Sequence, residues 1–172
     1  MAAGNLWPAA LMAVFAGSMV VAMAWDIGTY EIPDTLSLLL VAAGLAAVLA
    51  GGQGWSGLLS HGLGALAAFA FGLLMFVLGQ WGGGDVKFMA ATSLWLGWPL
   101  LLGYLMVVAL VGGVVTVALL VFRRFPLPAA WAARPWLARL HRAEQGVPYG
   151  VALGCGGLIV LRPAVLSVLG GL

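Results

Sequence analysis

Residues 80–87 read Gln-Trp-Gly-Gly-Gly-Asp-Val-Lys, and they stand between two long apolar runs of the chain. The consecutive glycines lead directly into Asp85, and Lys87 follows two residues later. A carboxylate at the mouth of a membrane segment costs free energy, so a functional role is the first hypothesis and a partner for the charge is expected. The partner we expect is Asp26, which directly follows the first apolar run.

The composition is that of an integral membrane protein. Of 172 residues, 64% are hydrophobic and only 7% are charged, whereas a soluble domain carries roughly 25% charged residues. The net charge is +2, and five arginines gather in residues 123–146. A basic loop between apolar runs is more typical of a topology signal than of a nucleic-acid surface, so no nucleic-acid partner is expected. The single cysteine, Cys155, excludes a disulfide within the chain and a paired-cysteine metal site, and no metal or cofactor is expected.

Apolar runs and their breaks predict an all-α bundle of about six transmembrane helices in a single membrane-embedded domain, residues 1–172. A spanning helix needs about 20 apolar residues. The uncharged run 88–122 would be about 52 Å long at roughly 1.5 Å per residue, too long for one crossing, and Gly97-Trp98-Pro99 is expected to break it. The fourth helix is then short and must be tilted or shielded by its neighbours. The expected helices are 6–25, 34–50, 55–79, 86–98, 100–122 and 148–169.

Three other features have structural interpretations. Gly64, Ala68 and Gly72 recur at four-residue spacing, which indicates a face for close helix packing. His61 stands alone in the same helix, and we expect a packed or interfacial side chain rather than a ligand. Residues 136–143 place apolar and basic side chains on different faces, so they form either a short helix on the membrane surface or a solvated loop.

The arginines also predict the orientation of the chain. By the positive-inside rule, the loop 123–146 lies in the cytoplasm. Counting the crossings back puts Asp85 on the cytoplasmic side, and two further crossings put Asp26 on that side too, with the N-terminus outside. The count depends on the fourth helix crossing the membrane. If this segment instead re-enters from one face, the number of crossings changes by one and the assignment of sides fails.

Two carboxyls on one membrane face can activate water. Like charges that share a site cannot both ionise, so one carboxyl holds a proton. The ionised partner takes a proton from water while the other donates to the carbonyl oxygen of a peptide, which is aspartyl proteolysis with Asp26 and Asp85 as the catalytic pair. A proton-coupled transporter could use the same acids as a relay, although transporter sites lie near the bilayer midplane. A non-catalytic scaffold, in which the acids are dispensable, is the third alternative.

Residues beside the two acids are candidates for shaping the site. The glycine run either lets an extended substrate lie against the backbone or is a linker, and Gly84 is expected to be its least tolerant member, since a positive φ there would exclude β-branched residues. Lys87 either anchors its helix at lipid headgroups or tunes the field of the acids. Asp34 is expected to cap the second helix, after a turn fixed by Pro33. The complete candidate set is Gly82, Gly83, Gly84, Lys87, Pro33, Asp34, Pro148 and Gly150.

With these stretches together, the chain resembles the prepilin peptidases, bacterial aspartyl proteases of the GxGD class. Residues 82–87, Gly-Gly-Gly-Asp-Val-Lys, match the family's G-x-G-D-x-K. Asp26, with Ile32-Pro33-Asp34 after it, matches the other catalytic Asp and its trailing I-P-[ND], and Pro148-Tyr149-Gly150 resembles a P-[FY]-G element of the last helix. The resemblance covers nearly the whole chain. It implies that Asp26 and Asp85 are the catalytic pair in the removal of prepilin leader peptides.

The chain also departs from the larger members of that family. It has no room between the first two helices for their cysteine-containing cytoplasmic insertion, so methylation of the new pilin N-terminus is not implied. It looks like the short Tad-type enzymes of the bacterial inner membrane that process Flp pilins and pseudopilins, which makes a prepilin, membrane lipid and a pilus or secretion machinery the expected partners. Archaeal preflagellin peptidases share both Asp motifs and remain an alternative. The P-A-L motif of presenilin-like proteases is missing from the late helices.

Overall fold

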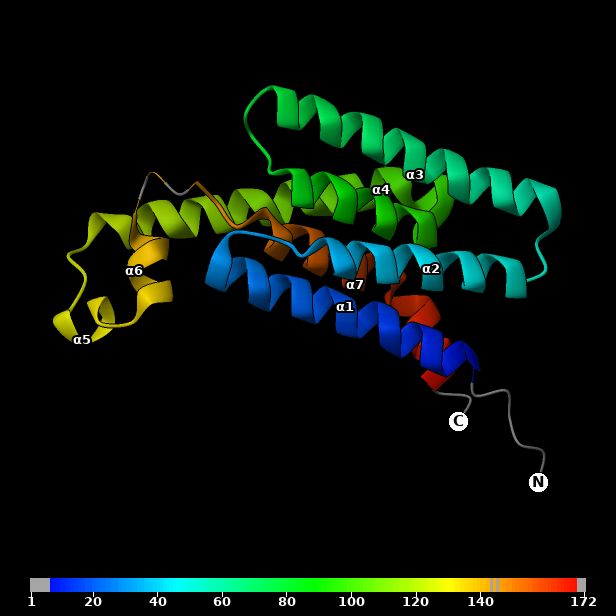
Figure 1. Cartoon of the computed structure of the whole chain (residues 1–172), viewed down its shortest axis with the longest axis horizontal. Coiled ribbons are helices and arrows are strands. Elements are labelled where there is room, and N and C mark those ends of the chain that lie inside the picture. Colours follow the sequence, from blue (N-terminus) through cyan, green and yellow to red (C-terminus); the bar gives the residue numbers. More distant parts are fainter. Residues whose placement is uncertain (1–6, 143, 145, 170–172) are drawn as a thin grey trace.

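The computed structural model describes residues 7–142, 144 and 146–169, and the side chains among them up to residue 161. Within these residues the chain forms seven helices and no strand (Figure 1). The helices are α1 (Trp7–Thr29), α2 (Asp34–Ala50), α3 (Gly54–Val77), α4 (Gly83–Arg124), α5 (Ala129–Ala132), α6 (Pro135–His141) and α7 (Tyr149–Leu169).

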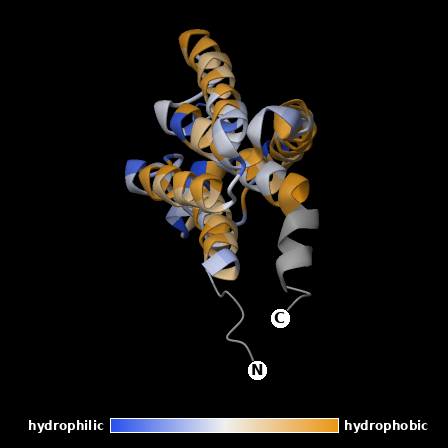
Figure 2. Cartoon of the chain, turned by 90° about the vertical axis from the view of Figure 1, so that its right-hand side faces the viewer, coloured by the Kyte–Doolittle hydropathy of each residue, from blue (hydrophilic) through white to orange (hydrophobic). Residues whose placement is uncertain are grey.

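The long helices run side by side along the long axis of the molecule (Figure 1). Three of them, α1, α3 and α4, are long and apolar enough to cross a membrane, and hydrophobic residues make up most of the helices along their length (Figure 2). The predicted all-α integral membrane fold is therefore confirmed. The turn after α2 lies at one end of the bundle, while the α1–α2 junction, the α3–α4 junction and the arginine-rich segment with α5 and α6 lie at the other end (Figure 1).

Helix α4 is two helical segments joined by a sharp break at Gly97. The glycine has φ 70° and ψ 176°, outside helical values, and Pro99 follows it. Such a conformation is open to glycine and closed to most other residues, so the predicted break is confirmed. The chain reverses direction at this point (Figure 1), which separates a short segment, 83–96, from a long one, 98–124.

The short segment of α4 forms the centre of the bundle. Its side chains are largely buried, among them Phe88, Met89 and Trp95, and this confirms that neighbouring helices shield it. The His61 ring nitrogen Nδ1 lies 2.8 Å from the carbonyl oxygen of Leu94. That carbonyl belongs to the last turn of the segment, where the break at Gly97 removes its helical partners. His61 is therefore a packed side chain that satisfies a helix end.

Small residues bring the other helices close to this central segment. A Cβ at Gly64 would lie 2.9 Å from the carbonyl carbon of Gly97, and one at Gly72 would lie 3.1 Å from Val86 Cγ1. Ala68, between them, is fully buried. The predicted packing face of α3 is confirmed, and close approach of this kind is how membrane helices gain van der Waals contact.

Several boundaries differ from the sequence prediction. Helix α1 continues through Thr29, so Asp26 lies inside its final turns rather than after its end. Helix α2 begins at Asp34 itself, with Pro33 at the N-cap and no side-chain capping bond, so the capping role predicted for Asp34 is wrong. Residues 135–141 form the short helix α6, which favours the helical alternative for this segment, although residue 143 lies outside the described part.

Candidate active site

Asp26 is held by the first turn of α7. Its side chain is 3% exposed, and its Oδ2 accepts a hydrogen bond of 2.6 Å from the backbone N–H of Gly150. A Cβ at Gly150 would lie 2.8 Å from both Cβ and Oδ2 of Asp26, so a larger residue there would push the carboxyl away. A helix N-terminus favours negative charge. Pro148, directly before α7, sets the start of this turn.

Asp85 lies in the first turn of α4 and is half-buried. Its Oδ2 accepts a 2.9 Å hydrogen bond from the backbone N–H of Gly82, which is the acidic half of a capping box. The other half is missing because Gly82 has no side chain. Each acid thus receives a main-chain N–H at the N-terminus of a different helix.

Gly84, next to Asp85 in α4, packs directly against the backbone of the α1–α2 junction. A Cβ at Gly84 would lie 2.9 Å from the carbonyl oxygen of Ile32 and 3.2 Å from its nitrogen. Gly84 has a helical backbone and no positive φ, so the conformational reason given for its intolerance does not hold. What the position requires is space for the Ile32 backbone. Gly83, by contrast, has nothing within 4 Å of its Cβ position.

Lys87 and Asp34 form an ion pair between the two motif-bearing junctions. Lys87 Nζ lies 2.8 Å from both Oδ1 and Oδ2 of Asp34. The ion pair with Asp34 was not among the roles expected for Lys87, and both expected roles, anchoring at lipid headgroups and tuning the field of the acids, stay predictions. The side chains are 51% and 62% exposed, so in water such a pair would contribute only about 0–1 kcal/mol. Its effect is to fasten the start of α2 to the start of α4.

The ion pair leads to a prediction with a small effect. On the resemblance to prepilin peptidases, Asp34→Asn and Lys87→Met are each expected to lower cleavage of a prepilin only a few-fold, because each variant loosens an exposed pair without removing a reacting group. The charge-reversed double variant, Asp34→Lys with Lys87→Asp, should recover most of the loss, measured at matched membrane levels. Complete loss in Asp34→Asn would show that Asp34, and not Asp26, is the first catalytic acid.

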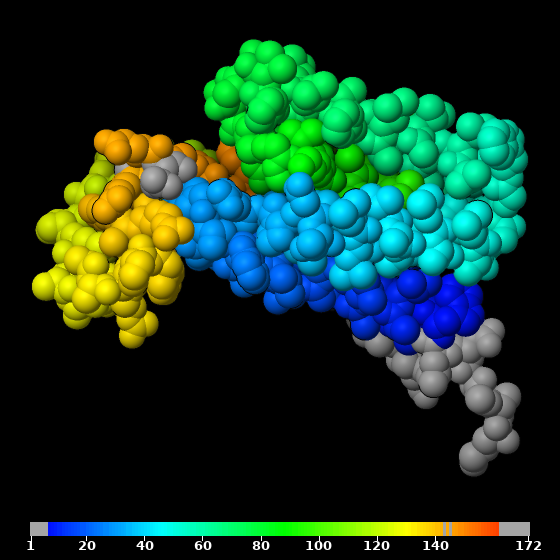
Figure 3. Space-filling view, viewed as in Figure 1, coloured from blue at the N-terminus to red at the C-terminus, as the bar shows by residue number. Residues whose placement is uncertain are grey.

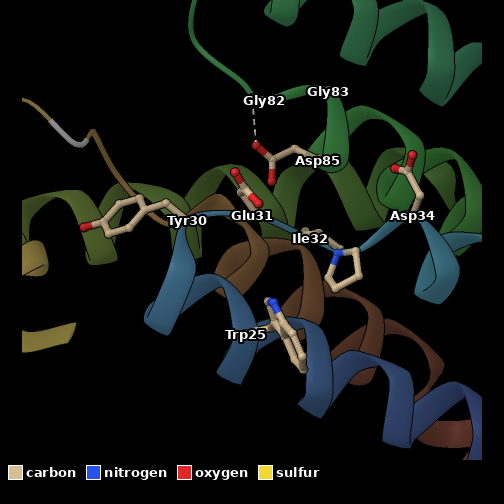
Figure 4. A pocket seen from close by; sticks show the side chains of 10 residues that line it. Trp25, Tyr30, Glu31, Ile32, Asp34, Gly82, Gly83 and Asp85 are labelled. Atoms are coloured by element: carbon tan, nitrogen blue, oxygen red, sulfur yellow. Dashed lines mark hydrogen bonds between the residues drawn. The ribbon is translucent and has the colours of Figure 1, made fainter. Parts of the chain in front are cut away.

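A polar pocket of about 400 Å³ opens beside Asp85. Figure 4 shows Asp85 and Glu31 side by side, with Tyr30 to one side of them and Trp25 below. Asp26 does not contribute to the lining and is buried where α1 meets the start of α7. The lining comes from the α1–α2 junction and the glycine run, namely Trp25, Tyr30, Glu31, Ile32, Pro33, Asp34, Gly82, Gly83, Gly84 and Asp85.

Some contacts at this end of the molecule were not predicted. Tyr30 is the one non-glycine residue with positive φ, 60°, among those described, and its backbone turns the chain from α1 toward Ile32. Arg139 of α6 donates a 2.7 Å hydrogen bond to the carbonyl oxygen of Gly28, which fastens the arginine-rich segment to the end of α1. Since Arg139 and Gly28 lie far apart in the sequence, no local pattern signals the contact between them.

An aromatic contact links Trp81, next to the glycine run, with Tyr149, next to Gly150. The ring centroids of Trp81 and Tyr149 lie 5.5 Å apart, and Trp81 also contacts Phe71 at 5.8 Å. Trp81 directly precedes the glycine run, and Tyr149 directly precedes the glycine that binds Asp26. The contact therefore holds the start of α4 near the start of α7. In the described part of the chain, no group of three or more His, Cys, Asp or Glu residues gathers as a metal site would require.

Fold and site define a membrane protein with paired carboxyls at one end of a helical bundle. Comparison with known sequences agrees with the motifs, because residues 13–117, more than half of the chain, match the type IV leader peptidase family. The chain belongs to this family.

Curated relatives are larger proteins. A prepilin leader peptidase/N-methyltransferase of Burkholderia pseudomallei (strain K96243) is 33% identical over 144 residues, which is 79% of this chain and 40% of that protein. Proteins of the same description from Pectobacterium carotovorum subsp. carotovorum and Aeromonas salmonicida (strain A449) are 33% and 31% identical, over 77% and 79% of this chain and 48% and 43% of theirs. The chain thus spans less than half the length of these relatives. No solved structure matches it.

Proposed function

We propose that this protein is a membrane aspartic endopeptidase that removes the leader peptide from prepilins or pseudopilins. One observation carries the proposal: Asp26 and Asp85, from helices far apart in sequence, are held at the same end of the bundle by the N–H groups of Gly150 and Gly82. Family membership supports the same reaction class. The position of the acids at one end, rather than midway along the helices, argues against the proton relay of a transporter.

In the proposed reaction, a water molecule lies between the two carboxyls. The ionised carboxylate takes a proton from the water, whose oxygen attacks the scissile carbonyl carbon, while the protonated carboxyl donates to the carbonyl oxygen. The C–N bond then breaks as the departing nitrogen takes the proton that the first carboxyl received from water, and a hydroxyl of the tetrahedral intermediate returns a proton to the other carboxylate. The pair titrates as a unit, so neither acid is assigned the proton. The pocket beside Asp85 would receive the extended peptide, and Gly82 and Gly83 would leave room for its backbone.

The substrate class we propose is the Flp-type prepilin, and the location is the bacterial inner membrane. Residues 7–169 show no large insertion between α1 and α2, whose junction is only residues 30–33, and this supports likeness to the short peptidases. The proposed orientation places the active site on the cytoplasmic side and the N-terminus outside. The fastening of α6 to α1 by Arg139 supports it, because the basic segment and the two acids then share one face.

The orientation predicts the accessibility of two positions. Single cysteines at Gly28 and Gly83, in a chain with Cys155 replaced by alanine, should react with a membrane-impermeant thiol reagent only from the cytoplasmic side. Both positions have open space around a Cβ, so a cysteine fits there. Inverted and right-side-out vesicles provide the comparison. Labelling of either cysteine in right-side-out vesicles would overturn the orientation.

The reaction itself is tested with purified protein and a purified Flp-type prepilin in detergent. The expected result is release of the leader peptide as a single product, identified by mass spectrometry, with no added cofactor. If the wild-type protein at stoichiometric concentration leaves every prepilin of its own genome uncut, the proposed activity is wrong.

A further inference from the structure

A second concavity lies next to the polar pocket and runs along the bundle. It has a volume of about 600 Å³ and is bounded by α2 on one side and α3 on the other, with the short segment of α4 as its floor. Helices α2 and α3 contact each other much less than each contacts α4. Figure 3 shows α4 at the bottom of the hollow between them. We call this concavity the α2–α3 groove.

The groove begins where the polar pocket ends. Asp34 contributes to both linings, and its ion-pair partner Lys87 lies at the mouth of the groove. From there the groove follows α2 to Leu45. The eleven helical steps from Asp34 to Leu45, at about 1.5 Å each, make it roughly 16 Å long, about three turns of an α-helix.

The lining of the groove suits a helix rather than a loosely held lipid chain. Its floor and one wall carry small side chains, Ala90, Ala91 and Ala65, while Leu38 and Phe69 stand at the rims. A floor of small residues lets a helix backbone approach closely, which is how helices pair in membranes. The remaining lining is Asp34, Ser37, Val41, Leu45, Lys87 and Leu94.

Ser37 supplies a second observation that points to a ligand. The residue is 5% exposed and contributes to the groove wall. Its hydroxyl has no hydrogen-bond partner within the described residues. A buried hydroxyl without a partner costs free energy, and an occupant of the groove with a polar or backbone group at this level would satisfy it.

We propose that the α2–α3 groove binds the apolar helix of the substrate, in the part of that chain adjoining the scissile bond. This inference rests on the proposed peptidase function and adds the path of the substrate. The peptide lies extended across the polar pocket at Asp85, passes the Asp34–Lys87 pair and continues as a helix between α2 and α3. Because Asp34 lines both the polar pocket and the α2–α3 groove, the two sites are continuous.

Cross-linking tests the docking without requiring cleavage. In a Cys155→Ala, Asp85→Asn chain, which should leave a co-expressed Flp-type prepilin uncut, a cysteine at Leu38 or Phe69 should form a disulfide with a cysteine in the apolar segment of the prepilin. Leu74→Cys is the matched control, because Leu74 is exposed on α3 but does not line the groove. Equal cross-linking from position 74 and from the groove positions, or none from the groove, would overturn the proposal, and a groove filled by lipid gives the latter result.

Filling the groove gives an independent readout. Ala65→Phe should lower cleavage of the full prepilin at least tenfold through a raised KM, while a soluble peptide spanning only the cleavage site is cut within about twofold of the wild-type rate. Ala70→Phe, on an exposed face of α3 outside the groove, should change neither. Equal losses on the two substrates, or no loss on either, would contradict the docking role. If the wild-type protein cuts neither substrate, the peptidase function fails instead, and the cross-links still decide the docking.

Discussion

Asp26→Asn and Asp85→Asn are each expected to abolish prepilin cleavage while the protein still accumulates in the membrane. Asparagine keeps the size and polarity of the side chain, so Gly150 and Gly82 retain an oxygen to which their N–H groups donate. It cannot accept and return a proton, and loss of a general acid or base typically costs about 10²–10⁴-fold. The measurement is the ratio of mature pilin to prepilin on an immunoblot, at matched peptidase levels.

Glu31→Gln is the matched control for these two substitutions. Glu31 is an exposed carboxylate in the same pocket as Asp85, but no described main-chain N–H at a helix start binds it. We expect this variant to lose far less activity than either catalytic variant. Mature pilin at wild-type levels in Asp26→Asn or Asp85→Asn would remove that acid from the mechanism.

Gly84→Ala is expected to lower cleavage by about 100-fold or more, and Gly83→Ala far less. The methyl group added at Gly84 would meet the carbonyl oxygen of Ile32 at 2.9 Å, whereas the one added at Gly83 meets nothing within 4 Å. Because the Ile32 contact is with backbone, it cannot be relieved by a side-chain rotation. The α1–α2 junction would have to move, and a displacement of catalytic groups by about 1 Å can cost 100-fold in rate.

Gly83→Ala is the matched control for Gly84→Ala. Both Gly83 and Gly84 lie in the first turn of α4, so their helix propensities change alike. Equal activity of the two variants would mean that the glycine run is only a linker. In that case the contact with Ile32 would have no part in aligning the acids.

The helices of this protein were largely predictable because a bilayer sets the length of apolar segments. The break at Gly97 was predictable for the same reason, since no single helix could use 35 uncharged residues in one crossing. The largely buried position of the short segment after Gly83 also followed, because a segment too short to cross must be covered by others. The end of α1 was not predictable to the residue, since Arg139, 111 positions away in the sequence, binds the carbonyl oxygen of Gly28 near its end.

For the candidate site too, one part was predictable from the sequence and another was not. The sequence motifs singled out Asp26 and Asp85, and the structure brings both to one end of the bundle, but the assignment of catalytic roles remains a prediction. The partners of the motif residues could not be read from local patterns. Lys87 binds Asp34 across 53 positions and Gly150 binds Asp26 across 124, and such pairs exist only after the helices have packed. Asp34 was wrongly predicted to cap α2, because a sequence alone shows the pattern typical of a helix start and does not show a long-range ion pair.

The most direct test of a shared role for the two acids is a single-turnover measurement on one prepilin, with enzyme in excess of substrate. The residual rate is measured for purified Asp26→Asn, for Asp85→Asn and for the double variant. Catalytic groups that act as one unit give non-additive losses. We therefore predict that the double variant is no slower than the slower single variant. A rate reduced by the product of the two single losses would show that Asp26 and Asp85 act independently, and would contradict the paired-carboxyl mechanism.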